Sequence, residues 1–296
     1  MSPTNGWIIL DKPLGLSSAQ GVAAVKRILR GVGIRPDRIG HGGTLDPLAT
    51  GVLPIAIGEA TKLAGRMLDA TKGYDFTVQW GTATATEDAE GAVTATSDVR
   101  PREAEIAAVL PRFTGPIDQV PPAYSALKVD GQRAYALARA GETVILATRH
   151  VTIHSLVLVA TTPDSATFSA SVSKGTYIRG LARDIAVVLG TVGHVVMLRR
   201  TQAGQFHLEQ AITLDKFESL VHTATLEQVL LPLMAGLDDI PALAIDPEQA
   251  AALRKGRRLF GHPAKPGTYL ACLGSVPVAL VEIDPEAVRV LRGFNL

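Results

Sequence analysis

Three side chains with catalytic chemistry stand out, each at a boundary between expected elements. Asp46 precedes Pro47, which disfavours helix at the residue before it and so holds the carboxylate on extended or turn backbone. Arg179 falls about three residues into an expected helix, where the positive end of the helix dipole disfavours a cation unless an anion pairs with it. Tyr74 heads an expected strand after Gly73. An aspartate so placed can act as a nucleophile or as a base.

None of the three residues identifies a function by itself. Taken alone, each residue favours a structural reading: Asp46 as a turn former, Arg179 as a solvated surface residue and Tyr74 as a half-buried strand residue. The segment GHGGTLDPLATG around Asp46 is rich in glycine, but it has neither a lysine–serine ending nor a G-x-G-x-x-G pattern that opens a helix. A nucleotide-binding loop is therefore not indicated.

Hydrophobic periodicity and turn residues predict the elements that position these side chains. Ser17 or Ser18 caps the first helix, and Thr176 caps the helix that carries Arg179. The expected strands are 7–10, 52–58, 74–80, 124–129, 150–159, 166–173 and 194–200, and the expected helices include 102–113, 132–140 and one that bears Lys62 and Arg66. Without regular βαβ spacing, this pattern predicts an α+β fold with a mixed, mostly antiparallel sheet and flanking helices.

The pattern changes after Pro241. A short helix, a basic turn and short strands at 268–273, 276–283 and 288–291 predict a small β-rich second domain. We therefore divide the chain into residues 1–240 and 244–296. The alternative is a peripheral extension of the first sheet.

Composition indicates an ordinary globular protein. The 296 residues are 47% hydrophobic and 19% charged, enough for a substantial core. No apolar run approaches the roughly 18 residues of a membrane span, and the start MSPTNGWIIL lacks the features of a signal peptide, so we expect a cytoplasmic protein. The single cysteine, Cys272, lies in an apolar stretch and excludes an internal disulfide. No heptad seam is evident, so we expect a monomer.

Charge is segregated along the chain. The net charge is +1 and the pI about 7.9, lower than for a dedicated nucleic-acid binder. Basic residues nevertheless cluster in 12–38, beginning with Lys12, and in 249–265, whereas acidic residues predominate in 82–108. These separated patches favour a polyanionic partner, and scattered solvated charge is the alternative.

Six segments occur in a characteristic order: WIILDKPLGLSS, GHGGTLDPLATGVLPIAIGEATK, KGYDF, PPAYSALKVDGQRAY, SKGTYIRGLARD and HVVMLRRT. Together they resemble the bacterial tRNA pseudouridine-55 synthases, the B class of pseudouridine synthases, along almost the entire chain. The tail from about residue 244 resembles, more weakly, the small PUA-like RNA-binding domain of that family.

The resemblance implies a role for each matching residue. Asp46 would be the catalytic aspartate, Arg179 the arginine that pairs with it, and Tyr74 the tyrosine that stacks on the target base. Substrate-binding roles would fall to His41, Lys62, Asp88, Lys174 and Tyr177. The implied substrate is the T-stem-loop of tRNA, with no metal and no cofactor. Two positions depart from the family pattern: Gly42 stands where threonine is familiar, and Ala85 stands where an aspartate is expected.

The implied reaction suits one carboxylate. The bond from C1′ to N1 breaks, the uracil turns over and C5 joins C1′, without net redox change or consumption of water. A paired Arg179 would keep Asp46 ionised and oriented. Asp46 could attack C1′, add to C6 or remove the C2′ proton; we favour the third route, and the sequence does not separate them.

Two other functions remain open from the sequence. A non-catalytic RNA-binding or RNA-folding protein would use the same basic segments and would not depend on Asp46. A hydrolase of nucleosides or glycosides would normally need a second carboxylate near the first, and none stands out near Asp46 in the sequence.

Overall fold

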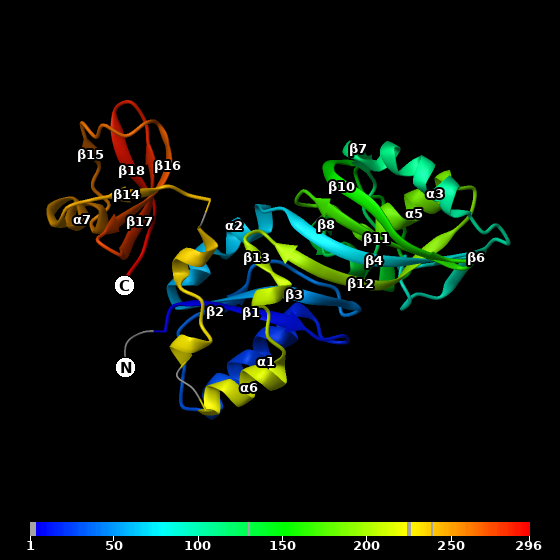
Figure 1. The fold of residues 1–296 in the computed structure, drawn as a ribbon, viewed down its shortest axis with the longest axis horizontal. Helices are drawn as coiled ribbons and strands as arrows, with labels where there is room; N and C mark the ends of the chain where they lie inside the picture. Colours follow the sequence, from blue (N-terminus) through cyan, green and yellow to red (C-terminus); the bar gives the residue numbers. More distant parts are fainter. Residues whose placement is uncertain (1–3, 130, 224–225, 238) are drawn as a thin grey trace.

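The central feature of the fold is one large mixed sheet (Figure 1). The computed structural model describes residues 4–129, 131–223, 226–237 and 239–296. The sheet has nine strands in the order β1-β3-β12-β4-β11-β10-β7, with β2 beside β3 and β13 beside β12. Its strands are β1 (Gly6–Lys12), β2 (Ile39–His41), β3 (Ala49–Ile57), β4 (Lys72–Trp80), β7 (Gly115–Gln119), β10 (Arg149–Thr162), β11 (Ser165–Val172), β12 (Gly193–Ala203) and β13 (Phe206–His207). Strands β3 and β12 pair in parallel and the other described pairs are antiparallel, which confirms the predicted sheet.

Two helices cover one face of the sheet at the β1–β3 end. They are α1 (Ser18–Gly31) and α6 (Leu214–Thr223). Ser17 caps α1, since its side chain accepts a hydrogen bond from the amide of Gln20 in a capping box. The apolar faces of both helices bury Val25 and Phe217 against Ile8 and Leu10 of β1. This packing places Ser18, at the start of α1, against Leu45 in the loop that follows β2.

A second helical layer covers the β4–β11–β10 part of the sheet. It contains α3 (Glu103–Val109), the short 3-10 helix η2 (Leu110–Phe113) and α5 (Ile178–Val188). Phe76, Trp80 and Phe168 form the aromatic centre of this core. Thr176 does not cap α5 as predicted. Tyr177 occupies the N-cap position, and the Thr176 hydroxyl donates instead to the carbonyl of Ser173 at 3.0 Å.

The remaining elements are short. They are η1 (Gly58–Leu63), α2 (Ala64–Asp69), β5 (Thr82–Thr84), β6 (Val93–Thr96), β8 (Lys128–Val129), β9 (Gln132–Arg133), α4 (Ala134–Arg139), η3 (Leu208–Gln210), η4 (Leu226–Gln228) and η5 (Leu233–Gly236). The strand predicted at 124–129 is therefore wrong except at its last two residues, and the helix predicted at 132–140 begins at 134. Both segments lie outside the main sheet, so the alternation of apolar and polar residues at 124–129 does not mark a strand with one buried face.

The C-terminal part forms a sheet of its own. Its strands run in the order β14-β16-β17-β18-β15 and pack on one helix, α7. The elements are β14 (Ala242–Ala244), α7 (Pro247–Arg254), β15 (Leu259–Phe260), β16 (Gly267–Leu273), β17 (Val276–Ile283) and β18 (Ala287–Gly293). Figure 1 shows this unit set apart from the main sheet. A β-rich C-terminal domain is thus confirmed, and the alternative of an extension of the first sheet is wrong.

The two parts of the chain are joined by apolar packing and by the last residues. Phe294, only 2% exposed, belongs to the same apolar cluster as Trp7 and Leu233. The backbone amide of Asn295 donates to Glu59 Oε2 at 2.8 Å. The tail of the chain is therefore bonded to η1 of the main body.

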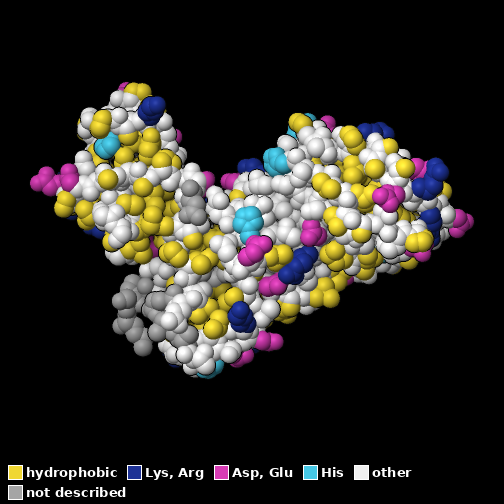
Figure 2. Space-filling view, in the orientation of Figure 1, with side chains coloured by type: hydrophobic (Ala, Val, Ile, Leu, Met, Phe, Trp, Pro, Cys, Tyr) yellow, Lys and Arg dark blue, Asp and Glu magenta, His cyan; other side chains and the backbone are white. Residues whose placement is uncertain are grey.

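The surface distribution of charge only partly follows the prediction. The basic residues Arg27, Arg30, Arg35 and Arg38 are exposed, and so are Arg254, Lys255, Arg257, Arg258 and Lys265. Lys12 is instead completely buried, so it does not belong to a surface patch. Figure 2 shows a face that is hollowed between the C-terminal domain and the rest of the molecule, with charged and histidine side chains near its centre. Across the described parts of the chain, no helix combines the length and apolar character required for a bilayer span.

Candidate active site

Asp46 lies in the loop of residues 42–48, between β2 and β3. This loop is anchored to the start of α1 because the buried Ser18 hydroxyl accepts from the amide of Leu45 at 2.7 Å and donates to its carbonyl at 3.1 Å. The carbonyl of Asp46 accepts from the amide of Ala49 at 3.0 Å as β3 begins. The backbone on both sides of Asp46 is thus fixed, while its side chain stays 43% exposed.

Two buried cations, Arg200 and Lys12, donate hydrogen bonds to the backbone of this loop and of its neighbours. The Arg200 side chain, with only 1% of the residue exposed, donates to the carbonyls of Val52 at 2.7 Å and Thr44 at 3.3 Å. The Lys12 ammonium donates to the carbonyls of Leu16 at 2.6 Å and Pro47 at 3.4 Å. Both side chains donate to backbone carbonyls in and next to the loop, and the amide of Gly15 donates to the carbonyl of Pro47 as well, at 2.8 Å, so the loop backbone is anchored at several points.

Burial also changes the protonation of Lys12. Loss of hydration lowers the pKa of Lys12 to about 8, and the positive charge of Arg200 lowers it too, whereas the carboxylate of Asp46 acts in the opposite direction. Burial likewise lowers the pKa of Lys72, which lines the cavity described below, to about 8. Neither Lys72 nor Arg200 was among the candidate residues, although both lie in the segments KGYDF and HVVMLRRT that carry the family resemblance.

Arg179 forms the centre of the ionic contacts around Asp46. Its Nη2 lies 2.9 Å from Asp46 Oδ2, and its Nη1 lies 3.4 Å from Asp88 Oδ2. The same two nitrogens donate to the carbonyls of Tyr124 at 3.0 Å and Thr86 at 2.7 Å. The Arg179 side chain is only 7% exposed, so four acceptors hold a buried guanidinium in one orientation. This geometry matches the pairing of Asp46 with Arg179 that the resemblance implied.

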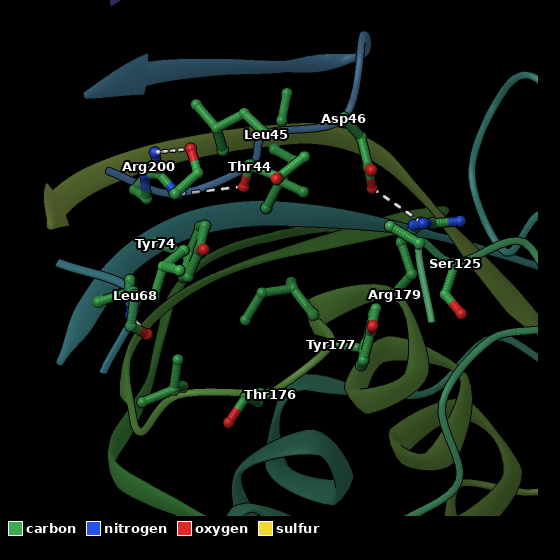
Figure 3. Close-up of a pocket in the computed structure, with 18 of the residues that line it drawn as sticks. Thr44, Leu45, Asp46, Leu68, Tyr74, Ser125, Thr176, Tyr177, Arg179 and Arg200 are labelled. Carbon is green, nitrogen blue, oxygen red and sulfur yellow. Dashed lines mark hydrogen bonds and ion pairs between the residues drawn. The ribbon is translucent and has the colours of Figure 1, made fainter. Parts of the chain in front are cut away.

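A cavity of about 350 Å³ opens beside this pair (Figure 3). Asp46, Tyr74, Tyr177, Arg179 and Leu198 are among the residues that line it. Figure 3 shows Asp46 and Arg179 on one side of the cavity and Tyr74 on another. Burial raises the pKa of the Tyr177 hydroxyl, which is therefore neutral at physiological pH. The cavity thus offers one carboxylate, aromatic rings and apolar walls, a combination suited to a planar, uncharged base.

His41 and Asp88 lie on the other side of the ion pair. A second cavity, of about 430 Å³, is lined by His41, Asp88 and Tyr135 and also by Asp46 and Arg179. Burial, followed by the charge of Arg200, lowers the pKa of His41, so its ring is neutral near pH 7. The Asp46–Arg179 pair therefore stands between two cavities, and His41 belongs to the second.

Lys62 and Lys174 are not among the residues that line either cavity. The Lys62 ammonium pairs with Glu59 at 2.6 Å and donates to the carbonyl of Gly293 at 2.9 Å, which places it at the junction with the C-terminal domain. The exposed Lys174 pairs with Asp69 at 2.9 Å, next to Ser173 and Gly175 of the first cavity. Lys174 is thus near the mouth of the cavity, whereas Lys62 holds the chain terminus.

The charged side chains around Asp46 form an ionic network centred on Arg179. Among the residues that the structure describes, no three His, Cys, Asp or Glu side chains are grouped so that they could share a metal ion. The second carboxylate near Asp46 is that of Asp88, whose Oδ1 accepts from the Thr86 hydroxyl and from the amide of Glu90 at 3.1 Å. Asp88 is buried and engaged, so Asp46 is the carboxylate that faces the first cavity.

Comparison with known proteins gives a consistent result. Residues 26–178 match the family model of the TruB family pseudouridylate synthase (N terminal domain), and residues 179–238 match that of the tRNA pseudouridylate synthase B C-terminal domain. The tRNA pseudouridine synthase B of Novosphingobium aromaticivorans is 64% identical over 99% of this chain and 98% of its own length. That of Zymomonas mobilis subsp. mobilis is 55% identical over the same shares of both chains.

Solved structures share the fold. A chain from the crystal structure of a Cbf5-Nop10-Gar1 complex is 27% identical, with a TM-score of 0.75 over 98% of this chain and 85% of that chain. A chain from an H/ACA RNP bound to a substrate RNA containing 2′-deoxyuridine has a TM-score of 0.74 at 24% identity over the same shares, and this likeness concerns the fold alone. Since the relatives match along nearly the whole of both chains and the two family models together span residues 26–238, the chain belongs to the tRNA pseudouridine synthase B family.

Proposed function

We propose that the protein isomerises a uridine in the T-loop of tRNA, at position 55, to pseudouridine, with Asp46 as the catalytic carboxylate. The observation that carries this proposal is the ion pair between Asp46 and the buried Arg179, set in a cavity that Tyr74 also lines. The family supports the reaction, because its named members are tRNA pseudouridine synthases. The assignment of Asp46 is ours.

The surroundings of Asp46 suit each stage of the reaction. Arg179 holds one oxygen of the Asp46 carboxylate at 2.9 Å, so that the other is free to approach the ribose or the base. Tyr74 and Leu198 supply surfaces against which a detached uracil can stay and turn over while water is kept out. We rank abstraction of the C2′ proton by Asp46 before attack at C1′ or addition to C6.

The target nucleotide must leave the stacked loop to reach Asp46, as in other enzymes that act on bases. In our proposal the first cavity receives the flipped uridine, with Tyr177 at its wall. His41 and Asp88, which line the second cavity, contact the RNA next to it. On binding, the Lys174 ammonium would leave Asp69 and pair with a phosphate of the RNA. Lys62 acts only indirectly, because its ammonium is committed to Glu59 and Gly293.

The exposed basic segments complete the proposed RNA surface. Arg27 and Arg30 on α1, together with the basic turn after α7, would contact phosphates, which position an RNA without reading its sequence. The C-terminal domain would then serve as a PUA-like RNA-binding module. We further propose that the protein acts as a monomer in the cytoplasm, where its tRNA substrate is found.

The proposal is tested by tritium release from a tRNA transcript labelled at C5 of uridine. We compare the wild type with Asp46→Asn and with the surface control Asp215→Asn. Each protein is used at a concentration that saturates the transcript, after a binding measurement has shown that the three bind it with similar affinity. Release by the wild type and the control, but not by Asp46→Asn, is the expected result. RNA binding without release by any of the three would instead support a non-catalytic RNA-binding protein, and free uracil among the products would support a hydrolase.

A further inference from the structure

The loop that delivers Asp88 to Arg179 contains an unusual backbone conformation. Glu87 has a φ of 62°, and it is the one non-glycine residue with positive φ in the described part of the chain. A side chain disfavours this left-handed region, and no hydrogen bond of the Glu87 side chain to its own loop explains it. The conformation is held by backbone bonds: Glu87 donates to the carbonyl of Thr84 at 3.1 Å and accepts from the amide of Val195 at 3.0 Å.

The left-handed residue changes the direction in which neighbouring side chains point. On extended backbone, consecutive side chains point to opposite sides. Here the consecutive carboxylates of Glu87 and Asp88 both meet helix α5: Glu87 Oε1 lies 2.5 Å from Arg183 Nη1, and Asp88 Oδ2 lies 3.4 Å from Arg179 Nη1. Arg179 and Arg183 are one helical turn apart, so the two acids match the spacing of the two arginines.

The Glu87–Arg183 pair is largely buried. The Glu87 side chain is 15% exposed and that of Arg183 is 30% exposed. Arg183 also donates to Asp184 at 2.8 Å and to the carbonyl of Val120 at 2.9 Å, so its guanidinium joins the acidic loop to the segment before residue 121. Burial raises the pKa of Glu87, although Arg183 opposes this effect. Keeping such a pair away from water is costly, and this cost needs a reason.

Neither partner belongs to the machinery described above. Glu87 and Arg183 line neither of the two cavities beside Asp46, and they pair with each other. Glu87 is nevertheless adjacent to groups that hold Arg179. Thr86 and Asp88, on either side of Glu87, supply two of the four acceptors of the Arg179 guanidinium. A shift of this loop along α5 would remove both acceptors at once and free Arg179 to turn away from Asp46.

We propose that Glu87 and Arg183 are positioning residues: their ion pair fixes the register of the acidic loop on α5, so that Thr86 and Asp88 orient Arg179 towards Asp46. The inference rests on the proposed function, because it gives the pair a role only if the orientation of Asp46 limits the reaction. It also gives the left-handed backbone at Glu87 a role, since in this conformation both acids meet the same helix.

The test separates the carboxylate from the backbone conformation. Glu87→Gly removes the carboxylate and relieves the strain, whereas Glu87→Ala removes the carboxylate and keeps the strain. We expect both variants to lower the single-turnover rate at saturating tRNA by about 10-fold or more, because small misplacements of a catalytic group are costly. The Kd for tRNA should change by less than about 2-fold, and Glu87→Gly should melt at a higher temperature than Glu87→Ala.

Two further variants act on the partner. Arg183→Met should reproduce the loss of rate, and Arg183→Lys, which keeps the ion pair, should recover most of it. Asp184→Asn is the matched control, because it removes another partner of Arg183 without touching the loop; its rate should stay within about 3-fold of wild type. A Glu87→Gly enzyme with the wild-type rate would overturn the proposal, and so would equal losses in Asp184→Asn and Arg183→Met.

Asp46→Asn, measured alongside, separates the positioning role of Glu87 and Arg183 from the proposed function. If Asp46→Asn is inactive while Glu87→Gly and Arg183→Met are fully active, the positioning role fails and the proposed function stands. If Asp46→Asn retains activity, the proposed function itself fails.

Discussion

The guanidinium Nη2 of Arg179 lies 2.9 Å from Oδ2 of Asp46, and the two side chains differ greatly in exposure, 7% for the arginine and 43% for the aspartate. The arginine is held by backbone carbonyls and by Asp88, so it forms part of the wall. The aspartate has one oxygen on that wall and projects into the cavity. A fixed cation and an accessible carboxylate are the arrangement that a reaction at a single aspartate requires.

Replacement of Arg179 should therefore abolish most of the activity. We expect Arg179→Met to lower the single-turnover rate by about 100-fold to 1000-fold, the size of effect seen when a preorganised partner of a reacting group is removed. Arg179→Lys should recover little of it, since one ammonium cannot reach Asp46, Thr86 and Tyr124 at once. Rapid-quench measurement of tritium release gives the rate.

The exposed Arg112 supplies a control for the loss of an arginine. Arg112→Met should leave the rate unchanged, and circular dichroism should show that the Arg179 variants are folded. Equal rates in Arg179→Lys and wild type would contradict a role for the forked geometry.

Lys12 should give the activity an alkaline limb. Because burial lowers the pKa of Lys12 to about 8, its ammonium loses a proton as pH rises through that value, and the positive charge near Asp46 and the bond to Pro47 weaken together. Lys12→Arg keeps the charge and should move the limb to higher pH. The measurement is the pH dependence of the single-turnover rate from pH 6 to about 10.

Lys72 is the necessary control, because burial lowers the pKa of Lys72 to about 8 as well. If Lys72→Arg and not Lys12→Arg moves the limb, the titrating group has been misassigned.

The effect of Lys12 on the free energy of unfolding has the opposite sign to its effect on the rate. Between about pH 8 and the unfolded pKa of 10.5, the unfolded chain binds a proton that buried Lys12 does not, so Lys12 makes stability rise with pH.

Gly42, which stands where the family usually has threonine, should not tolerate a side chain here. A Cβ at Gly42 would lie 2.7 Å from the Cβ of Met67 and 2.9 Å from its Cγ, closer than packed atoms allow. We expect Gly42→Ala to destabilise the protein by about 1–3 kcal/mol, the usual cost of overpacking. Urea unfolding measures it.

Two comparisons test the cause of that loss. Gly40→Ala, at a position with no heavy atom within 4 Å of the new Cβ, should be neutral. In a Met67→Ala background the cost of Gly42→Ala should shrink, which a double-mutant cycle would reveal. A cost that is the same in both backgrounds would show that Met67 is not the obstacle.

Lys62 should affect stability and leave the chemistry unchanged. Lys62→Met leaves the partly buried Glu59 and the carbonyl of Gly293 without this donor, and we expect a loss of about 1–3 kcal/mol in the free energy of unfolding. The single-turnover rate at saturating tRNA should stay within about 2-fold of wild type. The exposed Lys216→Met should change neither quantity. A large fall in rate with normal stability would restore the role that the family resemblance implied for Lys62.

Much of the architecture could be predicted from local pattern. Helical spacing of Val25 and Leu29 placed α1, and the apolar run from Val52 placed β3, because periodicity reports which face of an element is buried. The pattern failed at 124–129, where a short alternating stretch lies outside the main sheet. It also failed at Thr176. The hydroxyl of Thr176 donates to the carbonyl of Ser173 in the preceding turn, and the next residue, Tyr177, takes the N-cap position of α5.

The sequence by itself determined the order of the motifs, the family and the identity of Asp46, Tyr74 and Arg179 as candidates. Tertiary structure decided the partners of the charged groups. Lys12 was expected on a surface patch and is buried, and Lys62 was expected near the active site and bonds to the last strand. No sequence pattern marks Glu87, which pairs with Arg183. The physical reason is that an ionic partner depends on strand order and register, which bring together residues far apart in the chain, whereas periodicity carries information only about near neighbours.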